Sequence, residues 1–315
     1  MPLLHYAKVN INSNIFDVYD NKVTIQGIMR ELFSTIDVNE EYHKVEVRTF
    51  KDDEGEEKSV EYREVYNFSE LAKEEDVNKL QVSGKVVRRY PIVTEEFDET
   101  TRTSRRTVLE NNSSSILFYF DLETEIVVFS ERQKFGTRQF IEAFQELLNI
   151  FHKSVGFEIY LLQDPFSMKE RLENAYKIRK IKSTIIPPNV NEEALRDLYD
   201  KEVEEMKEAH ITKKTNVFEI NEKSTQGINL KSKMVEQVLE TNEAYEKFAR
   251  GYGKLEVEGE NRDGTLFKFD SEKDSLYQTQ IPEREKKSLE TFIEYCKKGI
   301  AIFSAKKTID KYTDR

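Results

Sequence analysis

The sequence predicts a mixed α+β fold in two domains, residues 1–164 and 165–315. The chain of 315 residues is long enough for two hydrophobic cores, and its 37% hydrophobic content, rich in Phe and Tyr, can fill them. Charged residues make up 35% of the chain, so many helices and strands carry one solvated face. Segments with the period of a strand are interspersed with segments of helical period, which is typical of an α+β protein.

The first domain begins with a predicted strand and helix. The stretch "LLHYAKVNI" has the apolar density of a strand, and a helix follows with Thr24 as its N-cap. The apolar stripe of this helix consists of Ile25, Ile28, Met29, Leu32, Phe33 and Ile36.

An insertion is expected at about residues 39–112, where the composition becomes strongly charged. The stretches "KVEVRTF" and "VEYREVYNF" alternate around the turn-like "KDDEGEEK", which predicts a charged hairpin. The polar stretch "EEFDETTRTSRRTVLENNSSS" follows, and we expect it to be a mobile connection.

The stretch from Ile116 to Ser130, "ILFYFDLETEIVVFS", predicts a second hairpin with its turn at Asp121 to Thr124. Thr137 is then expected to cap a helix that ends by Gly156, and "FEIYLLQ" supplies another strand. The stripe of this helix is Phe140, Ile141, Phe144, Leu147, Leu148 and Phe151. Without the insertion the order is β-α-β-β-α-β, that of a ferredoxin-like fold, in which two helices cover one sheet face and leave the other open.

The second domain is also predicted to be α+β. A short helix after Pro165 leads into the strand "KIRKIKSTII", and a charged helix runs from Asn191 to about Ala209. A strand near "NVFEI" and a helix from Ser232 to Ala249 follow. Three short strands and a C-terminal helix, with Leu289, Phe292, Ile293 and Cys296, complete the domain.

Charge and cysteine usage limit the classes of function. The net charge of -11 argues against a protein that coats nucleic acid indiscriminately, but it leaves room for a local basic patch. The single cysteine and the lack of CxxC spacing exclude an intramolecular disulfide and a zinc site, and indicate the cytoplasm. No apolar run approaches the about 20 residues needed to cross a bilayer.

Motifs for catalysis are missing. The sequence has no GxSxG, no Gly-rich nucleotide loop and no histidine spacing that would hold a metal, so we expect no cofactor and name no catalytic residue. A metal-dependent nuclease or toxin effector is an alternative, with Asp121, Glu158 or Asp164 near strand ends as ligands. The turn is a sufficient explanation for Asp121.

Clusters of Lys and Arg are the strongest candidates for a binding site, because phosphate contacts require local positive charge. The stretches that contain them are "KVVRRY", "RTSRR", "KIRKIK" and "ERQKFGTR". The alternative interpretation is a set of ordinary solvated strand and loop faces. The predicted nucleic-acid-binding residues are Arg88, Arg89, Arg105, Arg106, Lys177, Arg179, Lys180 and Lys182.

Several stretches taken in order resemble a bacterial family known as domain of unknown function 4747. They are "FYFDLETEIVVFS", "RLENAYKIRKIKSTIIPPN", "TNVFEINEKSTQGINLKSKM" and "ARGYGKLEVEGENRDG". The resemblance implies a setting in defence against phage and carries over no catalytic residue. We therefore expect an antiviral recognition module that binds nucleic acid or a phage protein. The alternatives are the nuclease or toxin effector and a non-catalytic structural subunit of a defence complex, and a homo-oligomer remains open.

Overall fold

The protein is described by a computed structural model that contains strands in two antiparallel sheets, with helices packed on them, so the mixed α+β class is confirmed. The structure describes residues 2–13, 15–51, 57–76, 79–163, 175–187, 203–221, 223–244, 253–262, 264–274, 276–282, 284–285 and 288–313. The predicted domain boundary at residue 164 lies outside these residues.

The larger sheet forms the body of the molecule and has the strand order β12-β1-β6-β5-β4-β3-β2, with β7 also paired to β1. All of its pairs are antiparallel. The predicted hairpin from Ile116 to Ser130 is confirmed, because Phe118 pairs with Phe129 and Asp121 with Ile126. Its strands are β1 (Leu3–Ile11), β2 (Glu41–Lys51), β3 (Glu57–Asp76), β4 (Lys79–Asp98), β5 (Thr103–Asp121), β6 (Ile126–Phe129), β7 (Phe157–Leu161) and β12 (Gln278–Gln280).

Three helices, α1 (Ile15–Tyr19), α2 (Ile25–Thr35) and α3 (Thr137–Phe151), share the main hydrophobic core with one face of this sheet. Thr24 caps α2 as predicted, because its Oγ1 accepts a hydrogen bond from the Gly27 N–H at 3.0 Å. The predicted stripe of α3 is confirmed by Phe140 and Phe144, which are fully buried. The N-cap of α3 is Gly136 and not Thr137, because Thr137 is the first helical residue.

The other face of the sheet is covered over β1, β5 and β6 by α8 (Leu289–Thr313). Phe292, Cys296 and Phe303 of α8 pack in one core with Tyr6 and Tyr119, so the prediction of an open face is wrong here. The sequence pattern of the first domain could not show this, because the covering helix comes from the end of the chain. Among the described residues, no helix is long and apolar enough to cross a membrane.

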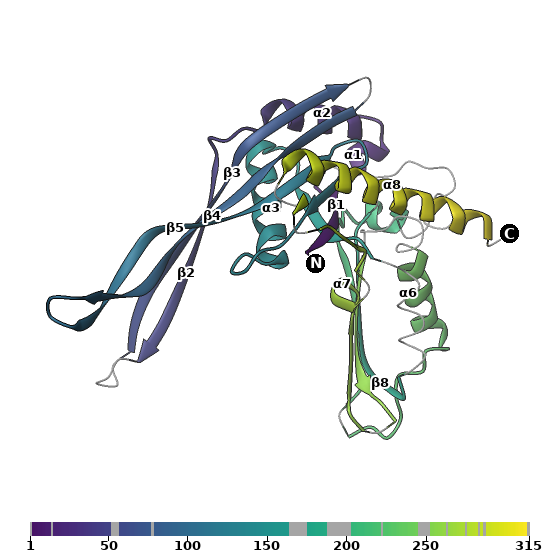
Figure 1. Ribbon diagram of the computed structural model, residues 1–315. Coiled ribbons are helices and arrows are strands. Elements are labelled where there is room, and N and C mark those ends of the chain that lie inside the picture. Colours follow the sequence, from purple (N-terminus) through teal and green to yellow (C-terminus); the bar gives the residue numbers. More distant parts are fainter. Residues whose placement is uncertain are drawn as a thin grey trace.

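The predicted insertion at about residues 39–112 forms β2, β3, β4 and the first half of β5. Its inner part belongs to the body, because Tyr66, Phe68, Val82 and Val86 lie in the main core, and its outer part extends far from the body as a long β arm (Figure 1). The expected mobile connection is therefore wrong: its residues continue β4 and β5, and the register sets Glu95 opposite Arg106 and Glu96 opposite Arg105. The arm forks because pairing between β3 and β4 ends before Pro91, which has no N–H to donate to a ladder.

The smaller sheet forms a second arm that projects in another direction (Figure 1), with the order β11-β10-β8-β9. Helix α6 (Lys233–Ala244) covers one face through Val235, which packs with Ile181, Leu255 and Phe269. The predicted strands in "KIRKIKSTII" and "NVFEI" are confirmed. The predicted helix from Asn191 lies mostly outside the described residues, although residues 203–208 are helical. The strands are β8 (Lys177–Ile185), β9 (Lys214–Glu219), β10 (Gly253–Glu260) and β11 (Leu266–Asp270), and a short helix α7 (Ser271–Asp274) follows β11.

Candidate functional site

Arg88 was predicted to contact phosphate, but its side chain is buried in the body, so this prediction is corrected. The guanidinium lies 2.5 Å from Glu64, donates a hydrogen bond to the carbonyl of Lys134, and lies 4.2 Å from the ring centre of Tyr90. The relative exposure of the two charged side chains is 8% for Arg88 and 6% for Glu64. Arg88 therefore holds β4, β3 and the loop before α3 together.

A small polar network surrounds this ion pair. Tyr66 donates a hydrogen bond to Glu64, and its ring stacks on that of Tyr42. Burial alone would raise the pKa of Glu64, but the hydrogen bonds from Arg88 and Tyr66 outweigh it and hold that pKa below its ordinary value. Burial, with the neighbouring carboxylate of Glu142, raises the pKa of Tyr42 to about 12. All of these shifts keep the native charges in place near neutral pH, as expected for a structural network.

The other predicted phosphate ligands that the structure describes are mostly paired across strands. Arg89 pairs with Glu41, Arg179 with Glu260, Lys180 with Glu219 and Lys182 with Glu256. Lys177 donates instead to the Ser224 carbonyl at 2.5 Å. Arg105 and Arg106 lie on β5 with side chains outside the described part. The predicted residues are thus spread over the body, the long arm and the second arm, and carboxylates neutralise much of the charge of those that are described.

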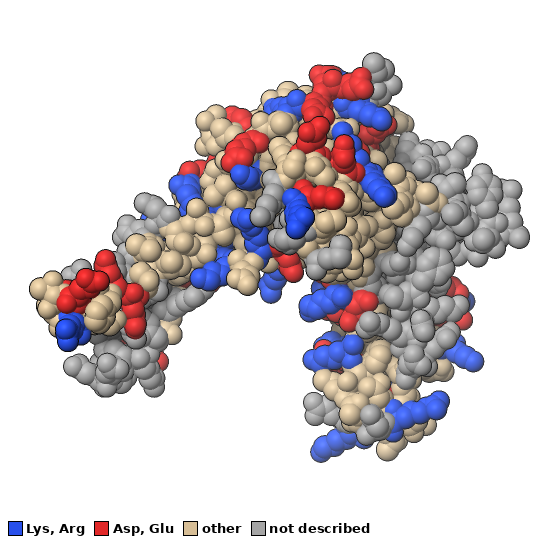
Figure 2. Space-filling view, viewed as in Figure 1, with Lys and Arg blue, Asp and Glu red and all other residues tan. Residues whose placement is uncertain are grey.

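The outer face of the second arm shows the same balance of charge. Lys254 lies 2.8 Å from both Glu256 and Glu272, and it is also near Asp270. Burial lowers the pKa of Lys254, but the hydrogen bonds to Glu256 and Glu272 raise it above its ordinary value. Figure 2 shows acidic and basic side chains interspersed over the body, whereas Lys and Arg predominate at the far end of the second arm.

The two described acidic residues of the nuclease alternative, Asp121 and Glu158, have other partners in the structure. Asp121 accepts hydrogen bonds from the backbone N–H groups of Glu123 and Thr124, so its role in the turn is confirmed. Glu158 pairs with Lys213 at 3.4 Å, and Asp164 lies outside the described residues. Over the described part of the chain, no group of three His, Cys, Asp or Glu could hold a metal ion.

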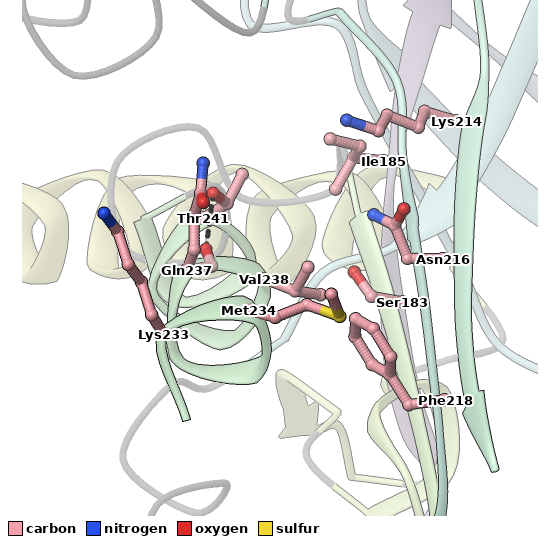
Figure 3. Close-up of a pocket in the computed structure, with 10 residues that line it drawn as sticks. All are labelled: Ser183, Ile185, Lys214, Asn216, Phe218, Lys233, Met234, Gln237, Val238 and Thr241. Carbon is pink, nitrogen blue, oxygen red and sulfur yellow. Dashed lines mark hydrogen bonds between the residues drawn. The ribbon is translucent and has the colours of Figure 1, made fainter. Parts of the chain in front are cut away.

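A groove of about 560 Å³ lies between α6 and the β8-β9 edge of the second arm (Figure 3). Its floor and walls include Ile185 of β8, Phe218 of β9, and Met234 and Val238 of α6. Lys214 and Lys233 also line it, and none of its described lining residues is a carboxylate. The sequence interpretation missed this site, because the period of a strand does not show whether that strand lies at the edge of a sheet.

Exposed apolar side chains concentrate on the two arms. Met234 beside the groove is 68% exposed, and Phe97 on the long arm is 62% exposed. Large exposed apolar residues that lie together mark binding surfaces more often than single ones do. The further members are Val45, Val47 and Leu109 on the long arm, and Tyr176, Val217 and Leu266 on the second.

The fold defines a mixed α+β protein with two projecting β arms. The family model described as "Domain of unknown function (DUF4747)" matches residues 48–297, and the chain belongs to this family. No curated protein matches the sequence.

Proposed function

We propose that this protein is a recognition module of bacterial antiviral defence that binds a partner protein, such as a phage protein, through its two arms without catalysing a reaction. The observation that carries this proposal is the concentration of exposed apolar side chains on the arms. Such residues anchor protein interfaces, which gain most of their affinity from a few buried apolar or aromatic groups. The defence setting is what the resemblance to the family implies.

The charge distribution supports protein as the ligand over nucleic acid. Arg88 is buried, and four of the other predicted cations are paired with carboxylates. A surface that binds phosphate needs several cations whose charge is not cancelled by neighbours.

Nucleic-acid binding is a second candidate, and one observation favours it. The end of the second arm carries Lys177, Lys223 and Arg262, with Tyr176 at 69% exposure beside them. Cations combined with an exposed aromatic ring are typical of surfaces that bind single strands.

We also propose that the body is an elaborated ferredoxin-like unit in the cytoplasm. The strand order β7-β1-β6-β5, with α2 and α3 on one face, supports the first part, because it is the order of split β-α-β units. The single cysteine, which is buried, supports a reducing compartment.

The test is to isolate the tagged full-length chain from bacteria that carry this gene, during phage infection, and to quantify the proteins that accompany it. Two variants remove apolar contacts from the arms: F97S with L109S on the long arm, and M234S with L266S on the second. We expect at least one variant to reduce the amount of a specific partner that accompanies the chain by about tenfold, because the loss of an anchor residue weakens an interface by about that factor.

A matched control replaces Val23 and Val38 with Ser, since both are exposed valines on the body. This control should retain the partner, and the thermal stability of all variants should match the parent. If both arm variants retain every partner, or if only nucleic acid accompanies the chain, protein recognition by the arms is wrong.

A further inference from the structure

Strand β9 forms one edge of the sheet in the second arm. Within the described part of the chain, β9 pairs with β8 and with no other strand. The Ile220 N–H donates to the Arg179 carbonyl at 3.0 Å, so the backbone groups of even-numbered residues point toward β8. Because these groups alternate along a strand, the N–H and C=O groups of Thr215, Val217 and Glu219 point away from the sheet.

The described residues in the middle of β9 carry none of the features that commonly protect an edge strand, which are lysines, proline and bulges. The four residues from Thr215 to Phe218 are uncharged and include no proline. The pairing of β9 with β8 runs from Lys214 to Glu219 without a shift in register. Val217 lies at the centre of the strand and is 51% exposed. This edge is therefore suited to pairing with a further strand.

The sequence of β9 is complementary to itself in an antiparallel pair centred on Val217. Such a pair sets Val217 opposite the Val217 of a second copy, and Thr215 opposite the Glu219 of that copy. In this register no two like charges face each other over Thr215–Glu219. A second copy of the same strand thus fits the edge.

The Thr215 hydroxyl supplies a donor for the Glu219 carboxylate of the second copy. Its Oγ1 lies 3.2 Å from the Thr184 Oγ1, and either hydroxyl can be the donor of that hydrogen bond. With Thr184 as the donor, the hydrogen of Thr215 is left for the second copy. Glu219 accepts a hydrogen bond from Lys180 at 3.2 Å, and a carboxylate can accept several, so Glu219 can bind both donors.

Helix α6 leaves space for the second copy, because it packs mainly against β8 and β10. The groove separates this helix from β9, and Phe218 lies there beside Met234, which is 68% exposed (Figure 3). In the antiparallel pair the grooves of the two copies meet, and each Phe218 lies diagonally across from the other. The pairing thus adds apolar contacts to the backbone hydrogen bonds.

We propose that two copies of this chain pair through β9 about a two-fold axis at Val217, which joins their four-stranded sheets into one. Val217 exchanges two backbone hydrogen bonds with its own copy, as Thr215 does with Glu219. The opposite edge of the arm is β11, and its Leu266 stays exposed to a partner protein. The inference goes beyond the proposed function and does not rest on it.

The test is sedimentation of the full-length protein in the analytical ultracentrifuge over a range of concentrations. We expect at least half of the chains to be in dimers at about 100 µM, which corresponds to a dissociation constant of about 100 µM or lower. A protein that is a monomer at this concentration would overturn the proposal. That result would leave protein recognition by the arms unaffected.

Two charged variants test the position of the axis. V217K and V217E each set like charges opposite each other, so each variant alone should dimerise at least about tenfold more weakly than the parent. An equimolar mixture of the two should dimerise again, because opposite charges then meet, and this recovery excludes misfolding as the cause. The matched control is V47K, at an exposed valine of β2, which should dimerise like the parent.

Proline at position 217 tests the backbone contacts. The Val217 N–H points away from β8, so V217P removes a hydrogen bond to the second copy and none within the sheet. This variant should be a monomer under conditions in which the parent is a dimer, with an unchanged circular dichroism spectrum. Parent-like dimerisation of V217P or of either charged variant alone, no recovery in the mixture, or dissociation of V47K would each overturn pairing through β9.

Discussion

Replacing Arg88 with alanine is expected to lower the free energy of unfolding by about 3 to 5 kcal/mol, the usual loss when one partner of a buried ion pair is removed. The variant leaves the carboxylate of Glu64, with 6% exposure, without its cation, and it removes the donor to the Lys134 carbonyl. The adjacent Arg89 is the matched control, because its pair with Glu41 is 39% exposed on both sides. Replacing Arg89 with alanine should cost about 0 to 1 kcal/mol.

The assay is urea unfolding followed by circular dichroism at neutral pH. A double variant with Met at positions 88 and 64 should recover part of the loss, because it removes both buried charges together. Equal effects of the Arg88 and Arg89 changes on the free energy of unfolding, each below about 1 kcal/mol, would refute the structural role of Arg88. Such a result would indicate that its side chain is exposed.

Three further outcomes follow from the structure. The pKa of Glu64 is lowered in the folded state. Its contribution to the free energy of unfolding is therefore present above its ordinary pKa and is lost as the pH falls through the lowered pKa. E64Q removes this titration, so it should flatten the acid side of the curve of stability against pH. Phe144 is fully buried among Phe68, Phe118, Phe120 and Phe140, and F144A should cost about 3 to 5 kcal/mol in the same unfolding assay. A Cβ at Gly299 would lie 1.8 Å from the Tyr6 hydroxyl, so G299A should lower the free energy of unfolding in the same assay. A301G, at an exposed position of α8, should lower it by about 1 kcal/mol or less.

Local patterns were enough to predict the hairpin at Ile116–Ser130 and the helix that carries Phe144, because both depend on neighbours in the sequence. The burial of Arg88 also had a signal, since it follows Val82 and Val86 at even spacing and therefore shares their face of β4. The sequence interpretation placed Arg88 at the surface because its side chain is long and charged, although its even spacing from Val82 and Val86 indicated the buried face.

Long-range pairing explains what the sequence could not predict. Helix α8 packs on the first sheet because Phe292 and Cys296 share one hydrophobic core with Tyr6 and Tyr119. These residues are distant in the sequence. The groove likewise needs β9 to be an edge strand, and that depends on the order of the whole sheet. Long-range pairing also explains why the predicted phosphate ligands are not free. The carboxylate that pairs with each of Arg88, Arg89, Arg179, Lys180 and Lys182 lies on another strand.

Chemical crosslinking of the protein to its partner, followed by mass spectrometry, tests protein recognition by the arms most directly. We expect crosslinks to the partner from Lys213, Lys231 and Lys233 on or beside the second arm. Lys153 and Lys298 on the body serve as internal references, and both are exposed. Crosslinks confined to those body lysines, with none from the second arm, would contradict recognition of a partner protein by the arms.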